Sequence, residues 1–238
     1  MTVALAVSGL FLVGGTANAG VLLDDHFDNG DLATGGVNGG FELLSNNNGV
    51  ATVVESGSVA AITTGAHANG AAGIESLNTF DPTSVTSFTV TWVIESAEQP
   101  ILNNGFMFTV DDAPGMWGSG FVFMIQADST LRIYDGYSSP GEDTYSLGTV
   151  TLSELADGFT LSITYDNTGM SWTATDAPSL VDGSITWEAL NGVGTYASFD
   201  ATMYVSTVLG GNAKAYNVDR ITVETPGGST PGTLIYGK

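Results

Sequence analysis

Hydrophobic and polar residues alternate along most of the chain after Val21, and almost no segment has the period of an amphipathic helix. The alternation is clearest in segment 159–165, where Phe, Leu, Ile and Tyr take one face and Thr and Ser the other. The turn residues 166–169 follow, and segment 170–175 then resumes the alternation with Trp172 inward. This pattern predicts a β-hairpin with one buried face and one wet face.

The same two-residue period predicts further short strands between Gly, Asn and Asp turns. We expect them at 88–95, 105–110, 120–127, 130–134, 184–190, 201–208 and 217–224, and less clearly at 51–55, 58–63 and 72–77. Residues 153–157 are expected to form one helical turn. Many short strands separated by frequent turns indicate an all-β sandwich or barrel.

Length, composition and charge narrow the possibilities. A chain of 238 residues with 43% hydrophobic residues fits one all-β domain with a full core. The formal net charge is -21, and only 4 residues are Lys or Arg. Such a protein repels nucleic acids, anionic membranes and anionic glycans, unless a divalent cation bridges the charges. With no cysteine, disulfides and thiol chemistry are excluded.

Residues 1–19 are typical of a secretory signal peptide, with a short apolar run that ends in Ala17-Asn18-Ala19. No Lys or Arg precedes the run, and a buried first strand is the alternative interpretation. We therefore expect a signal peptide over 1–19, one domain over 20–225 and a flexible tail over 226–238. The location expected is extracellular or on the cell surface.

The two ends of the expected domain carry a family resemblance. The chain opens with Asp-Asp-His-Phe-Asp (24–28) and closes on Val-Asp-Arg-Ile-Thr-Val (218–223), and it has a mid-chain hairpin at 159–175. In these respects it resembles the concanavalin-like, laminin-G-like jelly rolls of bacterial secreted and cell-surface proteins. The resemblance implies a two-sheet antiparallel β-sandwich in which the first and last strands pair. It also implies carbohydrate binding, adhesion or calcium binding, while some relatives are glycosidases or polysaccharide lyases.

The sequence has no recognisable catalytic motif. Laminarinase-like jelly rolls carry their carboxylates on one strand as Glu-x-Asp-x-x-Glu, and no such run occurs here. The neighbouring pairs Asp111-Asp112 and Glu142-Asp143 would point to opposite faces of a strand. Carboxylates from different strands can still meet. We expect a non-catalytic protein, with a glycoside hydrolase or polysaccharide lyase as the alternative.

Four aspartates between residues 24 and 31 suggest a cation site. An EF-hand loop anchored on Gly30 fails, because Phe27 and Gly36 fall on ligand positions. A looser calcium site built from Asp25, Asp28 and Asp219 becomes possible if the termini pair. The alternative is that these aspartates are solvated charges and turn residues.

Aromatic and polar residues indicate a neutral glycan as the partner, because sugar sites combine ring stacking with a few polar groups. By alternation, Trp92, Trp172 and Trp187 belong to the core. Trp117 lies between glycines and is the stacking candidate. The other expected ligand-binding residues are Gln126, Arg132, Tyr134 and Tyr137.

For Arg132 a surface ion pair is the alternative interpretation. A self-associating surface or matrix subunit is the other functional alternative.

Overall fold

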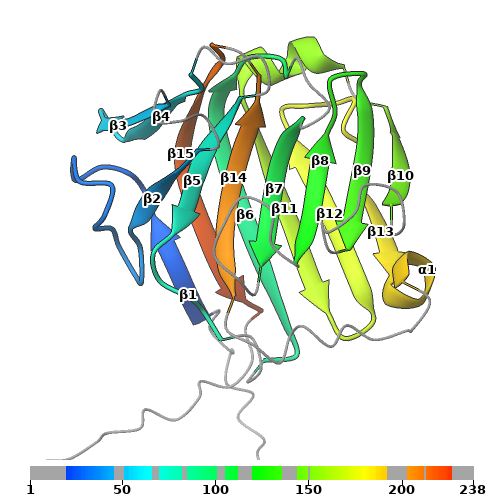
Figure 1. Ribbon diagram of the computed structural model, residues 1–238. Coiled ribbons are helices and arrows are strands. Elements are labelled where there is room, and N and C mark those ends of the chain that lie inside the picture. The colour runs from blue at the N-terminus through cyan, green and yellow to red at the C-terminus, as the bar shows by residue number, and fades with distance from the viewer. Residues whose placement is uncertain are drawn as a thin grey trace, which may run out of the picture.

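The protein folds as two antiparallel sheets stacked face to face, as the computed structural model in Figure 1 shows. The structure describes residues 20–45, 51–65, 70–81, 85–100, 105–111, 120–135, 144–149, 151–191, 203–211 and 213–226. The predicted signal peptide and all but the first residue of the predicted tail lie outside these ranges. In the described part of the chain, no helix has the length and apolar character needed to span a membrane.

The eight-stranded sheet has the order β13-β12-β11-β6-β15-β4-β3, and β1 also pairs with β15. Its strands are β1 (Gly20–Asp25), β3 (Thr52–Ser56), β4 (Val59–Thr63), β6 (Ser87–Ala97), β11 (Phe159–Asp166), β12 (Gly169–Thr175), β13 (Gly183–Thr186) and β15 (Ala215–Thr225). The first and last strands therefore pair, as the family resemblance implies.

The seven-stranded sheet has the order β10-β9-β8-β7-β14-β5-β2. Its strands are β2 (Phe41–Ser45), β5 (Ala71–Ser76), β7 (Phe106–Asp111), β8 (Phe121–Ile125), β9 (Thr130–Asp135), β10 (Thr144–Thr149) and β14 (Tyr204–Gly210). A 3-10 helix, η1 (Leu152–Asp157), and a short helix, α1 (Trp187–Asn191), lie between strands. Figure 1 shows β14, β7, β8 and β9 in front of the other sheet.

The core between the sheets is rich in aromatic rings. Trp92 of β6 meets Phe108 of β7 edge to face, with ring centroids 5.5 Å apart. Phe121 of β8 stacks on Trp187 of α1 at 4.8 Å. Edge-to-face and stacked ring pairs add about 0.5–1.5 kcal/mol each beyond the burial of their area. The predicted core positions of Trp92, Trp172 and Trp187 are confirmed, since none is more than 5% exposed.

The outer face of the eight-stranded sheet is wet and carries small hydroxyl side chains. Strand β11 alternates between buried and half-buried residues along its whole length, as the sequence predicts. Thr89 of β6 and Thr164 of β11 share a hydrogen bond of 2.7 Å across the strands. The hairpin at 159–175 is confirmed, and its turn is held by Asp166, which accepts from the amides of Thr168 and Gly169.

Most predicted strands agree with the structure to within a few residues, but one is wrong in its second half. The segment predicted as a strand over 184–190 leaves the sheet after Thr186 and continues as α1. Ala189, which strand alternation with Trp187 would place inward, is exposed on this helix. Trp187 still enters the core, because its indole N–H donates to the carbonyl of Asp166 at 2.8 Å. Strands β2 and β10 were not predicted.

Candidate functional site

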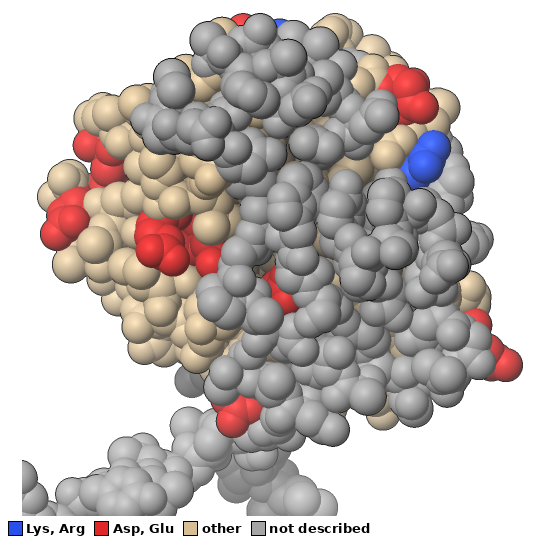
Figure 2. All heavy atoms as spheres, in the orientation of Figure 1, with Lys and Arg blue, Asp and Glu red and all other residues tan. Residues whose placement is uncertain are grey.

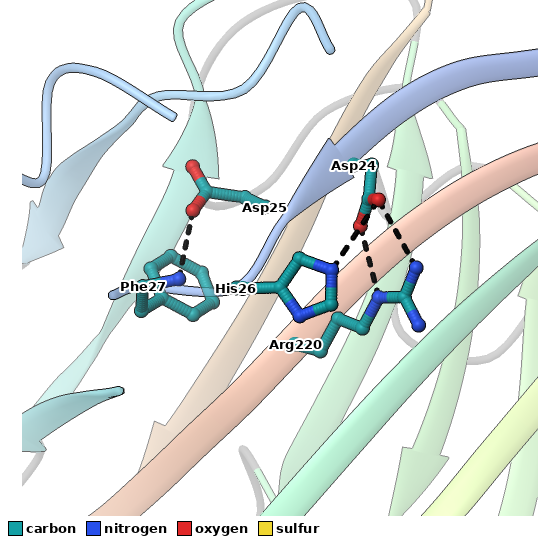
Figure 3. A network of polar contacts seen from close by, with 5 residues as sticks. All are labelled: Asp24, Asp25, His26, Phe27 and Arg220. Atoms are coloured by element: carbon teal, nitrogen blue, oxygen red, sulfur yellow. Dashed lines mark hydrogen bonds and ion pairs between the residues drawn. The ribbon is translucent and has the colours of Figure 1, made fainter. Parts of the chain in front are cut away.

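The aspartates at the start of the domain organise a loop. Asp25, at the end of β1, is 2% exposed. One carboxylate oxygen accepts the amide of Phe27 at 2.9 Å, as Figure 3 shows, and the other accepts the amide of Gly40 at 2.7 Å. The two bonds fix the ends of the segment that leads from β1 in one sheet to β2 in the other. Burial raises the pKa of the Asp25 carboxyl, although both amide bonds oppose that rise.

The predicted calcium ligands are not brought together. Both oxygens of Asp25 are occupied by amides, and a Cβ atom added to Gly35 would lie 2.0 Å from one of them. Calcium needs 6–8 oxygen ligands, and this packed carboxylate has no room for them. Asp28 is exposed in the loop. Among the described residues no three acidic or histidine side chains form a group that would hold a metal. The site proposed at Asp25, Asp28 and Asp219 therefore does not fit calcium.

Asp24 belongs to a polar network on the opposite side of β1. The guanidinium of Arg220 in β15 donates to both of its oxygens, at 2.9 and 3.0 Å (Figure 3). The imidazole of His26 lies 3.4 Å from the same carboxylate. The bond to Asp24 raises the pKa of Arg220. The network ties the first strand to the last, which gives it a structural role.

The loop after β1 is fixed by further carboxylate and amide side chains. Glu55 of β3 accepts the amides of Asn29 and Gly30 through one oxygen. Asp31 uses its carboxylate to accept the amide of Ala33 at 3.2 Å. The high density of acidic and amide residues is therefore explained by turns, since such side chains bond backbone N–H groups locally.

The outer face of the seven-stranded sheet carries a second hydrophobic cluster. Met107 of β7, Met124 of β8 and Val208 of β14 pair side by side in the strand register. With Ala71 and Val122 they form a set of buried side chains separate from the main core. We call these five residues the outer floor. The main core already covers the inner face, so β5, β7 and β8 are buried at every position.

Polar side chains lie beside the outer floor on the same face. Glu75 of β5 is 1% exposed, and the register places it next to Ser206 of β14. Thr109 of β7 lies on the other side of Ser206 and is also buried. On the edge strand β2, Glu42 stands directly opposite Glu75 and is exposed. Taking a carboxylate out of water costs free energy that its surroundings must offset, so a buried glutamate on a sheet face is a functional-site candidate.

The other edge of the outer floor holds Arg132, one of the predicted ligand-binding residues. Arg132 of β9 pairs with Met124, so it lies on this face as expected. It is half buried, and among the described residues its Nε atom, itself buried, has no hydrogen-bond partner. Asp128 nearby has a pKa lowered mainly by the Thr130 hydroxyl, with a smaller contribution from the Arg132 charge. No ion pair of Arg132 occurs in the described part of the chain.

The remaining predicted ligand-binding residues divide into three cases. Gln126 follows Met124 on this face, but it is 9% exposed and accepts the Thr130 hydroxyl at 2.9 Å, which holds the β8–β9 turn. Position 134 pairs with Val122, which puts Tyr134 in the register of the same face, while its side chain lies outside the described residues. Trp117 and Tyr137 lie outside them altogether.

Sequence reasoning missed Glu42 and Glu75. The segment 72–77 was expected as a strand, and in the structure Ile74 and Glu75 lie on opposite faces of β5. No local pattern in the sequence indicates that β2 pairs with β5 and sets the two glutamates opposite each other. Figure 2 views the molecule from the side of this sheet, and among the described residues visible there acidic side chains appear at several separate places and basic ones are scarce.

Comparisons with known proteins find the same architecture. No protein-family profile matches the sequence, and no curated protein is similar to it. Among solved structures, SCLam, a non-specific endo-β-1,3(4)-glucanase from family GH16, superposes with a TM-score of 0.55 at 12% identity, covering 87% of this chain and 91% of that one.

Two lectin-type structures are similar to the same extent. Arcelin-5, a lectin-like defence protein from Phaseolus vulgaris, gives a TM-score of 0.55 at 9% identity, covering 87% of this chain and 98% of that one. The exoplasmic domain of VIP36 in its Ca2+/Man-bound form gives 0.52 at 8% identity, covering 80% and 85%. The chain has the concanavalin-like jelly-roll fold. At these identities the concanavalin-like likeness shows the fold alone, and its neighbours include both lectin domains and glucanases.

Proposed function

We propose that the protein is a secreted, non-catalytic carbohydrate-recognition module that binds a neutral glycan along the outer face of the seven-stranded sheet. The observation that carries this proposal is the half-buried Arg132, whose buried Nε has no partner in the described structure and which borders the outer floor. The half-buried guanidinium carries five N–H donors, which suit sugar hydroxyls.

The opposite edge of the outer floor supplies acceptors. Glu42 is exposed there, and Tyr204 of β14 lies half buried on the same face. Carboxylates, a phenol and a guanidinium around an apolar floor are the kind of lining that binds polar ligands in a fixed orientation. Since Met107 and Met124 are no more than 1% exposed, the floor supports the polar groups and leaves the ligand contacts to them.

The test is retention of the purified protein on insoluble and immobilised neutral polysaccharides. We expect selective retention on one of them, and Arg132→Ala should weaken it about tenfold or more, since hydrogen bonds to a charged group contribute about 1.5–3 kcal/mol. Arg220→Ala is the matched control, because Arg220 is bound to Asp24 on the other sheet. Equal retention of both variants and the wild type would remove the outer face from the binding site.

A second candidate function, glycoside hydrolysis, is favoured by the facing glutamates. Residues directly opposite on antiparallel strands have Cβ atoms about 4.5–5.5 Å apart, which puts their flexible carboxyl groups within reach of the roughly 5–5.5 Å separation that retaining glycosidases use. Glu75 is buried and Glu42 exposed, so their environments differ in the sense that separates a proton donor from a nucleophile. Release of reducing ends from a polysaccharide, abolished in Glu42→Gln, would establish it. Retention without product release supports the recognition module.

Calcium and self-association stay predictions for this chain. Retention measured with calcium and with a chelator tests the first, and loss of retention on chelation would place a cation outside the Asp25 loop. Light scattering at increasing protein concentration tests the second. Assembly without any glycan retention would favour a structural surface subunit over the recognition module.

A further inference from the structure

A cavity separate from the outer face lies at the end of the eight-stranded sheet. Its volume is about 340 Å³, and it lies where β6 ends, β15 begins and η1 packs against β6. Its lining residues are Ser96, Ala97, Glu98, Gln99, Ala156, Lys214, Ala215, Tyr216 and Asn217. None of them belongs to the face proposed above for glycan binding.

The cavity is built at an irregular part of the sheet. Ser96 and Asn217 pair across the strands, and the β6–β15 register then shifts on both sides of Val218. Such bulges turn side chains away from regular alternation and are common beside binding sites. Glu98 closes the end of the strand pair: its amide donates to the Ala215 carbonyl at 3.0 Å, and one carboxylate oxygen accepts the Ala215 amide at 2.7 Å.

Several polar groups of the cavity have hydrogen-bonding capacity left over. The second carboxylate oxygen of Glu98 has no partner in the described structure. The side-chain amide of Asn217 donates to Glu95 at 3.3 Å, which leaves its carbonyl oxygen as an acceptor. Lys214 forms no ion pair within the described part of the chain, and its ammonium is a donor. The three residues that carry these groups, Glu98, Lys214 and Asn217, therefore line one small space.

The charges of the cavity indicate a neutral ligand. Glu98 and Lys214 are the only ionisable side chains that line it apart from the buried phenol of Tyr216, so the local charge balances in a protein whose formal net charge is -21. Its volume lies at the low end of ligand sites, which run from about 300 to 1,000 Å³. We infer that this cavity binds a single neutral sugar ring, with Glu98 and Asn217 accepting its hydroxyls and Lys214 donating to them.

This inference does not rest on the proposed function of the outer face. If both sites bind sugars, one molecule can hold two glycan chains, and retention on a dense matrix then exceeds the affinity of either site. The cavity is therefore tested with single sugars, which separates its failure from a failure of the outer face.

The experiment titrates the isotope-labelled full chain with glucose, galactose, mannose and N-acetylglucosamine, and with the amino acids glutamate and alanine for comparison. Binding is followed by the shifts of the amide NMR signals. We expect one of these sugars to shift the amides of Glu98 and Ala215, because the bond between them reports on the carboxylate, and to leave Ser206 unchanged. Shifts caused by glutamate or alanine, but by none of the sugars, would overturn the sugar assignment. No shift with any compound would overturn the site.

Two variants make the test specific. Ala156→Trp fills the cavity from an exposed position of η1 and should abolish the shifts. Glu98→Gln keeps an oxygen for the Ala215 amide but removes the charge, and should weaken binding about tenfold. Glu188→Gln, an exposed change on α1, is the matched charge control and should bind as the wild type does. Sugar shifts that persist in Ala156→Trp would place the ligand elsewhere.

Discussion

The two sheets of this sandwich share one core but differ on their outer faces. In the eight-stranded sheet, β6 and β11 alternate between buried and more exposed positions, and their outer residues are mostly Thr and Ser. In the seven-stranded sheet, β5, β7 and β8 are buried at every position and add Met, Val and a glutamate to the outside. The eight-stranded sheet therefore has a solvated outer face, whereas the seven-stranded sheet is buried on both faces along β5, β7 and β8 and more exposed at β2.

The difference shows where the sequence departs from what stability alone requires. Hydroxyl side chains that pair across strands, such as Thr91 with Ser162 at 2.9 Å, have a low desolvation cost on a solvated face. A carboxylate such as Glu75 is costly in a buried layer and must be compensated by its surroundings. Like charges directly opposite are destabilising, so the pair of Glu42 and Glu75 also weakens the sheet edge. We attribute the buried Glu75 and its pairing with Glu42 to the function proposed for this face.

The largest effect is expected when one side chain is truncated on the buried outer face and compared with a truncation on the solvated outer face. Met124→Ala should lower the free energy of unfolding by about 2–5 kcal/mol, because it opens a cavity in the outer floor. Thr164→Ala, which removes a cross-strand hydroxyl pair, should cost about 0.2–1 kcal/mol. Urea unfolding followed by fluorescence measures both. Equal costs would mean that the two outer faces do not differ in the way described.

An intermediate effect is expected at the junction between the sheets. Asp25→Asn leaves only one side-chain oxygen for the amides of Phe27 and Gly40, and should cost about 1–3 kcal/mol. Circular dichroism during thermal unfolding measures the loss. An unchanged melting temperature would show that the loop from β1 to β2 does not depend on this carboxylate.

The difference in stability between the wild type and Asp25→Asn should depend on pH in a defined direction. Because burial raises the pKa of Asp25 in the folded state, folding favours the protonated carboxyl. The part of the stability that comes from this protonation is complete below the unfolded pKa of about 3.9 and is lost as pH rises through the folded pKa. The advantage of the wild type over Asp25→Asn should therefore shrink as pH rises across that window. An advantage that grows instead would contradict the raised pKa.

The smallest effect is expected from the ion pair on the solvated face. Arg220→Ala removes a two-bond pair with Asp24, yet the arginine side chain is 36% exposed. Partly exposed pairs contribute about 0–1 kcal/mol, and salt screens them. Unfolding at low and high salt should show a loss below about 1 kcal/mol that decreases with added salt. A larger loss, insensitive to salt, would indicate that Arg220 acts through packing.

The regular part of the fold was predictable from alternation. Phe159, Leu161 and Ile163 point into the core as their spacing requires, because side chains on a strand alternate between faces. The segment 184–190 shows the limit of this reasoning. Ile185 and Trp187 are both buried, but the chain changes from strand to helix between them, and burial alone does not distinguish the two.

The candidate site was predictable only in part. Arg132 lies on the outer face as expected, because its neighbours Leu131 and Ile133 are core residues of the same strand. Asp25 was expected to bind calcium and instead binds backbone amides, because local turns use carboxylates in the same sequence pattern. Glu42 and Glu75 are 33 positions apart, and no local pattern predicts that they face each other.

The all-β class, the inward face of each strong strand and the acidic, cysteine-free composition can be read from the sequence, because they depend on residue type and short-range period. Which strands pair, which outer face is buried and which polar groups converge became known from the folded structure. Those outcomes depend on contacts between residues far apart in the chain. The pairing of β2 with β5 and the cavity where β6 meets β15 are both of this kind.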